Sequence, residues 1–227
     1  KVVNQYLTND QILDLQSDYE KTYDQYREAD IPVITKVNAK VDILPETRSI
    51  KASADFTVIN KSNKLIHKVL INQPSNSKDW HVNIEGGKLQ NIDETLRTAW
   101  LVFDEPMQVG ELRQGSMSVI RVNEGFKDKG FDFSVVENGT FINNFELFPS
   151  FGVNVGGYIA DRHERRKRDL PAPKRANDLE DEKYYNESFF GKGVDFIDFE
   201  TTISTAEDQV AIAPGYLQKE CSERGRR

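Results

Sequence analysis

Apolar and polar residues alternate between Val33 and Ile71, and this alternation is the clearest pattern in the sequence. The first run alternates Val33, Thr35, Val37, Ala39, Val41 and Ile43 with Lys36, Asn38, Lys40 and Asp42. A second run covers 50–58, and a third covers 65–71 after the turn residues 60–63. A period of two indicates strands with one face on a core and the other in water, as in an antiparallel sheet.

A helix is predicted from Thr8 to Ala29, because apolar and aromatic residues there recur every three or four positions. The stripe consists of Ile12, Leu15, Tyr19, Tyr23 and Tyr26. Thr8 and Gln11 fit a capping box at the start, and Ile31-Pro32 ends the segment. A stripe half made of tyrosine suits an interface that is partly exposed to water. We therefore expect the helix to lie against the sheet or to lead in from a preceding segment.

Further short strands are predicted along the rest of the chain, separated by turn residues. They cover 80–84, 98–103, 116–122, 131–135, 141–148, 199–204 and 210–213, with an Asn138-Gly139 turn before 141–148. Such spacing is typical of all-β architectures. We predict a mainly β fold: an antiparallel β-sandwich or saddle of two bent sheets, with an N-terminal helix and a short helical insertion.

The composition changes between residues 161 and 190, which we interpret as a surface insertion with a short helix. A basic stretch (162–168) precedes Pro171-Ala172-Pro173 and an acidic stretch (178–182). The chain is then expected to return to the core through Phe189, Phe190, Phe196, Ile197 and Phe199. We accordingly divide the chain into an N-terminal helical lead-in (1–30) and a β-saddle domain (31–227).

The bulk composition excludes some classes of protein. Of the 227 residues, 37% are hydrophobic and 30% charged, which is polar yet sufficient for a core, and the net charge of −7 argues against a nucleic-acid-binding protein. No run approaches the roughly 20 apolar residues that cross a bilayer. The start does not resemble a signal peptide. We expect the chain to be a piece of a longer protein rather than a trimmed mature one, with any membrane segments and active site outside it.

No motif identifies an active site. His163-Glu164 begins like H-E-x-x-H, but position 167 is Lys, so the second zinc ligand is missing, and His67 and His81 are expected to be structural. There is no G-x-S-x-G, and the glycines are not arranged as a phosphate loop. The single Cys221 has no local His and excludes an internal disulfide. We assign no catalytic, cofactor-binding or metal-binding residue, and expect this chain not to be an enzyme.

The basic stretch from Arg162 to Arg168 has two interpretations. The simpler one is a solvated helix face, and the other is contact with anionic lipid headgroups near a membrane.

Two stretches carry a resemblance to a known family. The first runs from Tyr19 through IPVITKVNAKVDILPETRSIKASADFTVINKSNKLIHKVLI, ending at Ile71, and the second is FETTISTAEDQVAIAPGYLQKE, residues 199–220. The first resembles the opening of the N-terminal β domain of M1-family zinc aminopeptidases, and more closely the version fused to bacterial ABC-2-type transporter permeases. The second is similar to a segment near the end of that domain. ENGTFINN (137–144) and DRHERRKRDLP (161–171) also look like this family.

The resemblance implies a membrane permease part followed by an extracytoplasmic M1-like region. That region begins with a saddle-shaped β domain and continues into a thermolysin-like catalytic domain carrying G-x-M-E-N, H-E-x-x-H and a distant Glu. None of these motifs occurs here, so no catalytic or zinc residue carries over to any position of this chain. Zinc would belong to the absent catalytic domain, and this chain needs no cofactor.

The resemblance thus implies a non-catalytic, extracytoplasmic β domain, periplasmic or extracellular, of a membrane-anchored protein. It would pack on the missing zinc-peptidase domain and wall its peptide cleft, with the rest of the parent chain and a peptide as partners. The tyrosine-rich helix stripe and the C-terminal edge are the surfaces expected to meet missing parts.

The alternative is a free-standing extracytoplasmic β-sandwich module that binds a protein or a glycan. A clustered aromatic patch on an exposed sheet face would favour it. A third class, an independent enzyme, has no visible catalytic constellation.

Overall fold

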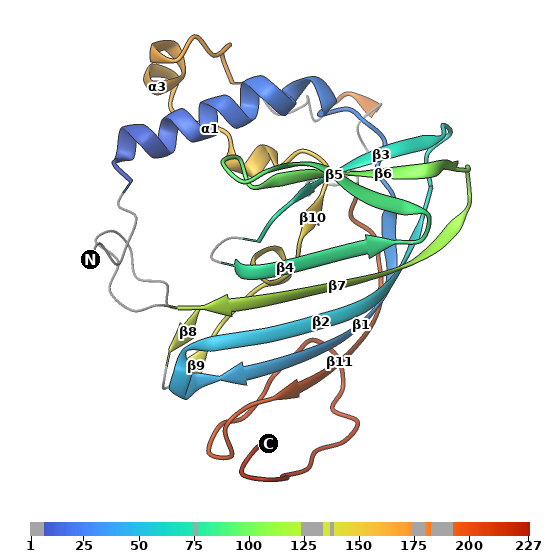
Figure 1. Cartoon of the computed structure of the whole chain (residues 1–227), viewed down its shortest axis with the longest axis vertical. Coiled ribbons are helices and arrows are strands. Elements are labelled where there is room, and N and C mark those ends of the chain that lie inside the picture. The colour runs from blue at the N-terminus through green and yellow to red at the C-terminus, as the bar shows by residue number, and fades with distance from the viewer. Residues whose placement is uncertain (1–6, 75–76, 124–133, 137–138, 174–179, 183–192) are drawn as a thin grey trace.

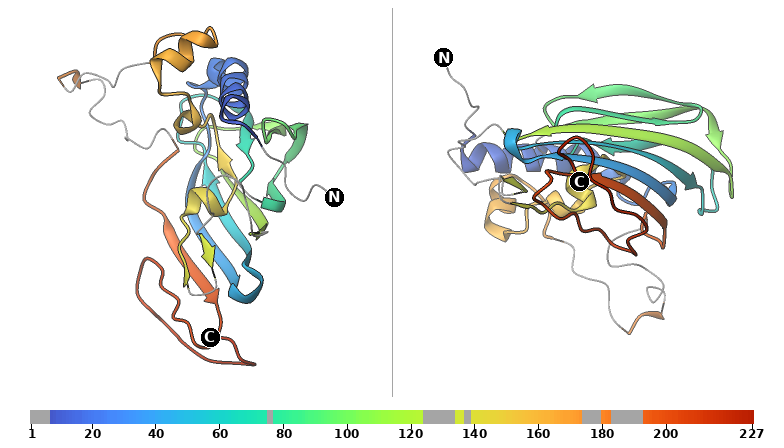
Figure 2. Two further views of the ribbon diagram at one scale, coloured as in Figure 1. Left: turned by 90° about the vertical axis from the view of Figure 1, so that its left-hand side faces the viewer. Right: turned by 90° about the horizontal axis from the view of Figure 1, so that it is seen from below.

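The computed structural model describes residues 7–74, 77–123, 134–136, 139–173, 180–182 and 193–227. Two β-sheets pack face to face, and one long helix crosses the outer face of the smaller sheet (Figure 1). The prediction of a mainly β, sandwich-like fold with an N-terminal helix is confirmed. The sheets are strongly bent, as the two views of Figure 2 show.

The larger sheet has five strands in the order β11-β1-β2-β7-β4. Their bounds are β11 (Asp198–Ser204), β1 (Val33–Leu44), β2 (Ser49–Ile59), β7 (Leu112–Val122) and β4 (Ser77–Ile84). Neighbours are antiparallel except β1 and β11, which run parallel. A register shift between Ile34 and Lys36 interrupts the predicted alternation at the start of β1.

The smaller sheet has the order β10-β3-β6-β5. Its strands are β10 (Ser150–Phe151), β3 (Ile66–Asn72), β6 (Thr98–Met107) and β5 (Gly87–Asp93). A short hairpin pairs β8 (Val135–Val136) with β9 (Gly139–Thr140), so Gly139 of the predicted turn belongs to a strand. Residues 131–133 and Asn138 lie outside the described residues.

The core lies between the two sheets. The inward residues of β1, β2 and β7 meet those of β3 and β6, and the largest fully buried side chains include Phe56, Ile50, Ile71, Ile84 and Leu101. Phe56 lies directly over Gly115 of β7, where a Cβ atom would come within 2.4 Å of the ring. The close fit of an aromatic ring over a glycine therefore holds β2 and β7 together.

Asn60 ties together two connections that carry the chain from one sheet to the other. Its side chain is fully buried, and its Nδ2 donates to the carbonyl oxygens of Lys64 (2.8 Å) and Met107 (3.1 Å). Its own backbone carbonyl accepts from the Gly110 amide at 2.8 Å. The β2–β3 turn and the β6–β7 turn are thus joined by one amide side chain.

Helix α1 (Asn9–Tyr23) begins with the predicted capping box. The backbone amide of Gln11 donates to Thr8 Oγ1 at 3.2 Å, and the backbone amide of Thr8 donates to Gln11 Oε1 at 2.8 Å. The α-helix ends six residues earlier than predicted, and a 3-10 turn, η1 (Asp24–Tyr26), follows it. The tyrosine stripe faces the smaller sheet: Tyr19 donates to Asn72 Oδ1 and Tyr23 bonds to Thr98 Oγ1, both at 2.7 Å.

The remaining helices are short. They are η2 (Pro45–Thr47), α2 (Asn144–Leu147), η3 (Val155–Gly157) and α3 (Arg162–Lys167), the last being the predicted helix of the 161–190 segment. Helix α3 lies beside α1 at one end of the molecule, and the C-terminal residues lie at the other (Figure 1). Among the described helices, none is long and apolar enough to span a bilayer.

Three strand or core predictions are wrong. The segment 141–148 contains α2, because Asn143 and Glu146 form a capping box that starts a helix there. The segment 210–213 is exposed chain with no partner strand among the described residues. Phe196, Ile197 and Phe199 do not enter the core; Phe196 is 99% exposed. Phe189 and Phe190 lie outside the described residues.

Candidate functional site

The three histidines lie far apart in the fold and are all exposed: His67 on β3, His81 on β4 and His163 on α3. Within the described part of the chain, no group of three or more His, Cys, Asp or Glu side chains is placed to hold a metal ion. Lys167, at the position of the missing second zinc ligand, donates instead to Glu164 Oε1 at 2.9 Å. Lys167 and Arg168 hold the pKa of the Glu164 carboxyl below its usual value. Cys221 is an exposed free thiol.

The basic stretch is not simply a solvated face. Arg165 is buried, and its guanidinium donates to Glu20 of α1 at 2.5 and 2.9 Å and to the Ile159 and Pro171 carbonyl oxygens at 2.8 and 2.7 Å. Arg168 donates to Asp14 of α1 at 2.8 Å. Two of the basic side chains therefore attach α3 to α1, which the composition of the stretch did not reveal.

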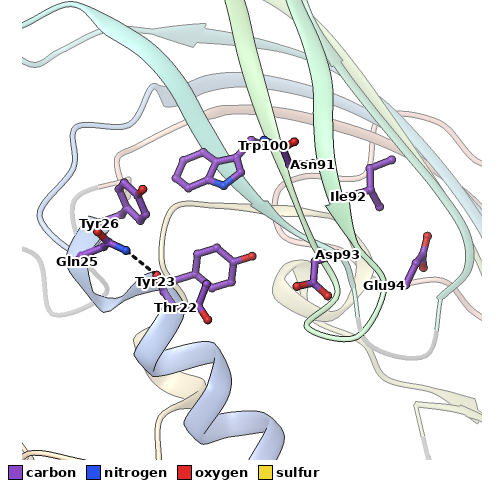
Figure 3. A pocket seen from close by; sticks show the side chains of 9 residues that line it. All are labelled: Thr22, Tyr23, Gln25, Tyr26, Asn91, Ile92, Asp93, Glu94 and Trp100. Atoms are coloured by element: carbon purple, nitrogen blue, oxygen red, sulfur yellow. Dashed lines mark hydrogen bonds between the residues drawn. The ribbon is translucent and has the colours of Figure 1, made fainter.

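An open pocket of about 490 Å³ lies between the end of α1 and the turn joining β5 to β6 (Figure 3). Its aromatic wall consists of Tyr23, Tyr26 and Trp100, and the Tyr26 and Trp100 rings meet edge to face with centroids 4.8 Å apart. The ammonium of Lys68 lies 4.1 Å from the Trp100 ring centroid, a cation–π contact.

Two polar side chains of this pocket, Asp93 and Gln25, form hydrogen bonds within their own turns. Asp93 Oδ1 accepts from the amides of Thr95 (2.9 Å) and Leu96 (2.8 Å), which closes the β5–β6 turn. Gln25 Nε2 donates to the Thr22 carbonyl at 3.1 Å, the dashed bond in Figure 3. The pocket is therefore a structural junction between helix and sheet.

The tyrosine stripe is not the exposed partner surface that the sequence suggested. Tyr23 is 5% exposed, and Tyr19 both donates to Asn72 and accepts from the Asn154 amide at 2.9 Å. Burial raises the pKa of the Tyr19 phenol to about 12. The stripe is satisfied within this chain, so that expectation is wrong.

The C-terminal edge, in contrast, stays open. We define the C-terminal surface as four exposed apolar side chains that follow β11: Val210, Ile212, Tyr216 and Leu217. They belong to a loop (205–227) whose ends are fastened: the Thr205 and Arg227 backbones exchange two hydrogen bonds, of 2.8 and 3.0 Å. Arg226 also pairs with Asp42 of β1. Between these ties the loop extends away from the sheet (Figure 1).

β11 itself forms one edge of the larger sheet. It pairs with β1 over seven residues, and across the described residues no other strand bonds to it. An edge strand next to an exposed apolar loop is the arrangement that pairs with further polypeptide.

Comparison with known proteins gives partial structural likenesses. No family model matches the chain, and no curated protein matches it. Among solved structures, the M1 zinc metallopeptidase from Deinococcus radiodurans is similar over 41% of this chain and 21% of its own, with 8% identity and a TM-score of 0.32. A mutant two-domain M1 zinc metallopeptidase bound to L-tryptophan is similar over 46% of this chain and 23% of its own, with 10% identity and a TM-score of 0.33. The chain thus spans about a fifth of the length of these solved chains.

Proposed function

We propose that this chain is the non-catalytic β domain of a larger, M1-aminopeptidase-like protein, and that the rest of that protein packs on its C-terminal surface. The observation that carries the proposal is the exposure of that surface: Ile212, Tyr216 and Leu217 are 88%, 93% and 79% exposed. A soluble domain rarely leaves several large apolar side chains together in water unless another surface covers them.

The position of this surface agrees with the sequence resemblance. The stretch that is similar to the end of an M1-type β domain, residues 199–220, contains β11 and most of the C-terminal loop. In the proposed protein, the domain that follows would meet this loop directly. The β domain would then form one wall of a peptide cleft, while zinc and the catalytic carboxylate belong to the following domain.

A membrane-anchored parent and an extracytoplasmic location belong to the same proposal. They rest on the likeness of the 19–71 sequence to the version of this domain that is fused to ABC-2-type permeases, and residues 161–171 also look like this family. Arg165 and Arg168 of that second segment are engaged with α1, which leaves Arg162 and Arg166 as its exposed arginines. Headgroup binding by the whole stretch is therefore not part of the proposal.

The alternative of a free-standing protein- or glycan-binding module has less support. The aromatic cluster on the outer face of the smaller sheet, Tyr23, Tyr26 and Trp100, packs on itself and on Lys68, and Tyr23 is only 5% exposed. The outer face of the larger sheet is mainly polar along its described strands, and no Phe, Tyr or Trp lies among its side chains.

The test uses the full-length protein encoded by the gene that contains this sequence. We expect it to bind zinc and to cleave aminoacyl reporter substrates, with cleavage lost on adding a chelator, while residues 1–227 alone do neither. Bound zinc without cleavage would indicate a peptidase fold used only for binding. A gene that encodes no further domain, or a full-length protein with neither zinc nor cleavage, would overturn the proposal.

A further inference from the structure

An apolar cavity of about 650 Å³ opens at the edge of the sandwich where β1 and β11 face β3 and β10. The strands contribute Ile34, Val37, Val69, Met117 and Phe151, while Ile197 lies on the loop side. It is distinct from the C-terminal surface, because none of the four side chains of that surface lines it.

The cavity exists because the two sheets are not closed at this edge. β10 is only two residues long, and the residues just before β11 form no strand. Gly152 and Gly193 approach Ile31 so closely that a Cβ atom at either position would lie 3.2 or 2.9 Å from its side chain. The backbone is thus drawn tightly around Ile31.

The size and lining of the cavity are those of a ligand site. Small-molecule sites occupy a few hundred to a thousand Å³ and are mostly apolar with a few polar groups. An apolar molecule is the filling that these walls favour.

The charged groups at the cavity indicate the charge of the ligand's polar end. The Arg27 guanidinium already lies 3.7 Å from the Asp24 carboxylate, and the Asp195 carboxylate already pairs with Lys61. The ammonium of Lys68 contacts the rings of Trp100 (4.1 Å) and Tyr26 (4.8 Å). Those ring faces hold the charge in place but leave its N–H groups available to an anion. Asp30 and Glu28 also line the cavity, so the binding experiment compares an acid with an amine.

We propose that this cavity binds a linear apolar molecule with one carboxylate end, as in a medium- or long-chain carboxylic acid. The chain lies between the sheets, and the carboxylate bonds to Lys68. This inference does not depend on the proposed peptidase context, because it uses only residues within this chain.

The experiment follows the fluorescence of undecanoic acid carrying a dansyl group, displaced by dodecanoic acid, dodecanol or dodecylamine. We expect saturable binding at one site per chain, with the acid at least ten times tighter than the alcohol or the amine. Lys68→Met should remove that preference and Lys68→Arg should keep it. The matched control Lys40→Met changes a lysine on the outer face of the larger sheet and should have no effect.

A second variant tests the cavity itself. Ile197→Trp places a large ring into the space from its loop side and should weaken all three ligands at least tenfold, whereas Val109→Trp, in the β6–β7 turn, should not. Circular dichroism confirms that each variant folds. Absence of saturable binding, an amine that binds as tightly as the acid, or a Lys68→Met variant with unchanged acid affinity would each overturn the proposal.

Discussion

The guanidinium of Arg165 and the carboxylate of Glu20 form a two-point ion pair, with N–O distances of 2.5 and 2.9 Å, that joins α3 to α1. Both side chains are 5% exposed. Breaking a buried pair by removing one partner leaves an uncompensated charge in the interior. Of the two arginine contacts that attach the 161–171 segment to α1, this is the buried one; the Arg168 pair with Asp14 is more exposed.

We predict that Glu20→Gln lowers the free energy of unfolding by about 3 kcal/mol, because it leaves the Arg165 charge buried without its partner. Urea unfolding followed by circular dichroism measures this. The matched control is Lys88→Gln, which removes the exposed pair with Asp104 and should cost less than about 1 kcal/mol. Equal effects of the two substitutions would contradict a structural role for the buried pair.

Tyr19 makes the free energy of unfolding depend on pH in the alkaline range. Its pKa is raised to about 12 in the folded state, mainly by burial, from an ordinary value of 10.0. The unfolded chain therefore loses this proton at a lower pH than the folded one. The stabilisation is fully present below pH 10 and is lost as the pH rises from 10 towards 12.

In Tyr19→Phe, we therefore expect the free energy of unfolding to fall less steeply between pH 10 and pH 12 than in the unsubstituted protein. The variant should also be less stable at neutral pH, because Asn72 and the Asn154 amide lose their partner. Tyr216→Phe, at an exposed position, is the control and should keep the original slope. Parallel slopes in all three proteins would refute the assignment to Tyr19.

The contact between Gly115 and Phe56 predicts an intolerance to any added side chain. A Cβ atom at position 115 would lie 2.4 Å from Phe56 Cζ and 2.8 Å from the Asn83 carbonyl oxygen. Gly115→Ala should cost about 1–3 kcal/mol through overpacking. Gly139→Ala, where no heavy atom lies within 4 Å, should change stability by about 0.5 kcal/mol or less. Thermal unfolding compares the two.

The strands that the sequence revealed are those whose alternation reflects one buried and one solvated face. β2, and β1 from Lys36 onward, show this pattern, so their extents are predictable. β5 gives a weak signal because five of its seven residues are not large and apolar, and of the other two only Leu89 packs against the core, Ile92 being 56% exposed. The segment 141–148 resembles a strand because Phe141, Phe145 and Phe148 follow an Asn-Gly turn signal, whereas the Asn143–Glu146 capping box starts a helix there.

Longer-range relationships left weaker traces in the sequence. Arg165 looks like its basic neighbours, and only the tertiary contact with Glu20 distinguishes it. Phe196, just before β11, has the sequence context of a core residue, but no second layer of the described structure covers it and it is 99% exposed. The cavity at Lys68 depends on how two sheets diverge at an edge, which no local pattern encodes.

The central claim is that the C-terminal surface is covered by the rest of a larger protein. Amide hydrogen exchange over residues 205–217 tests it most directly, in residues 1–227 alone and in the full-length protein. We predict fast exchange in the isolated chain and exchange at least tenfold slower in the full-length protein, with β2 as an internal reference that stays protected in both. Equally fast exchange of residues 205–217 in both proteins would contradict the account.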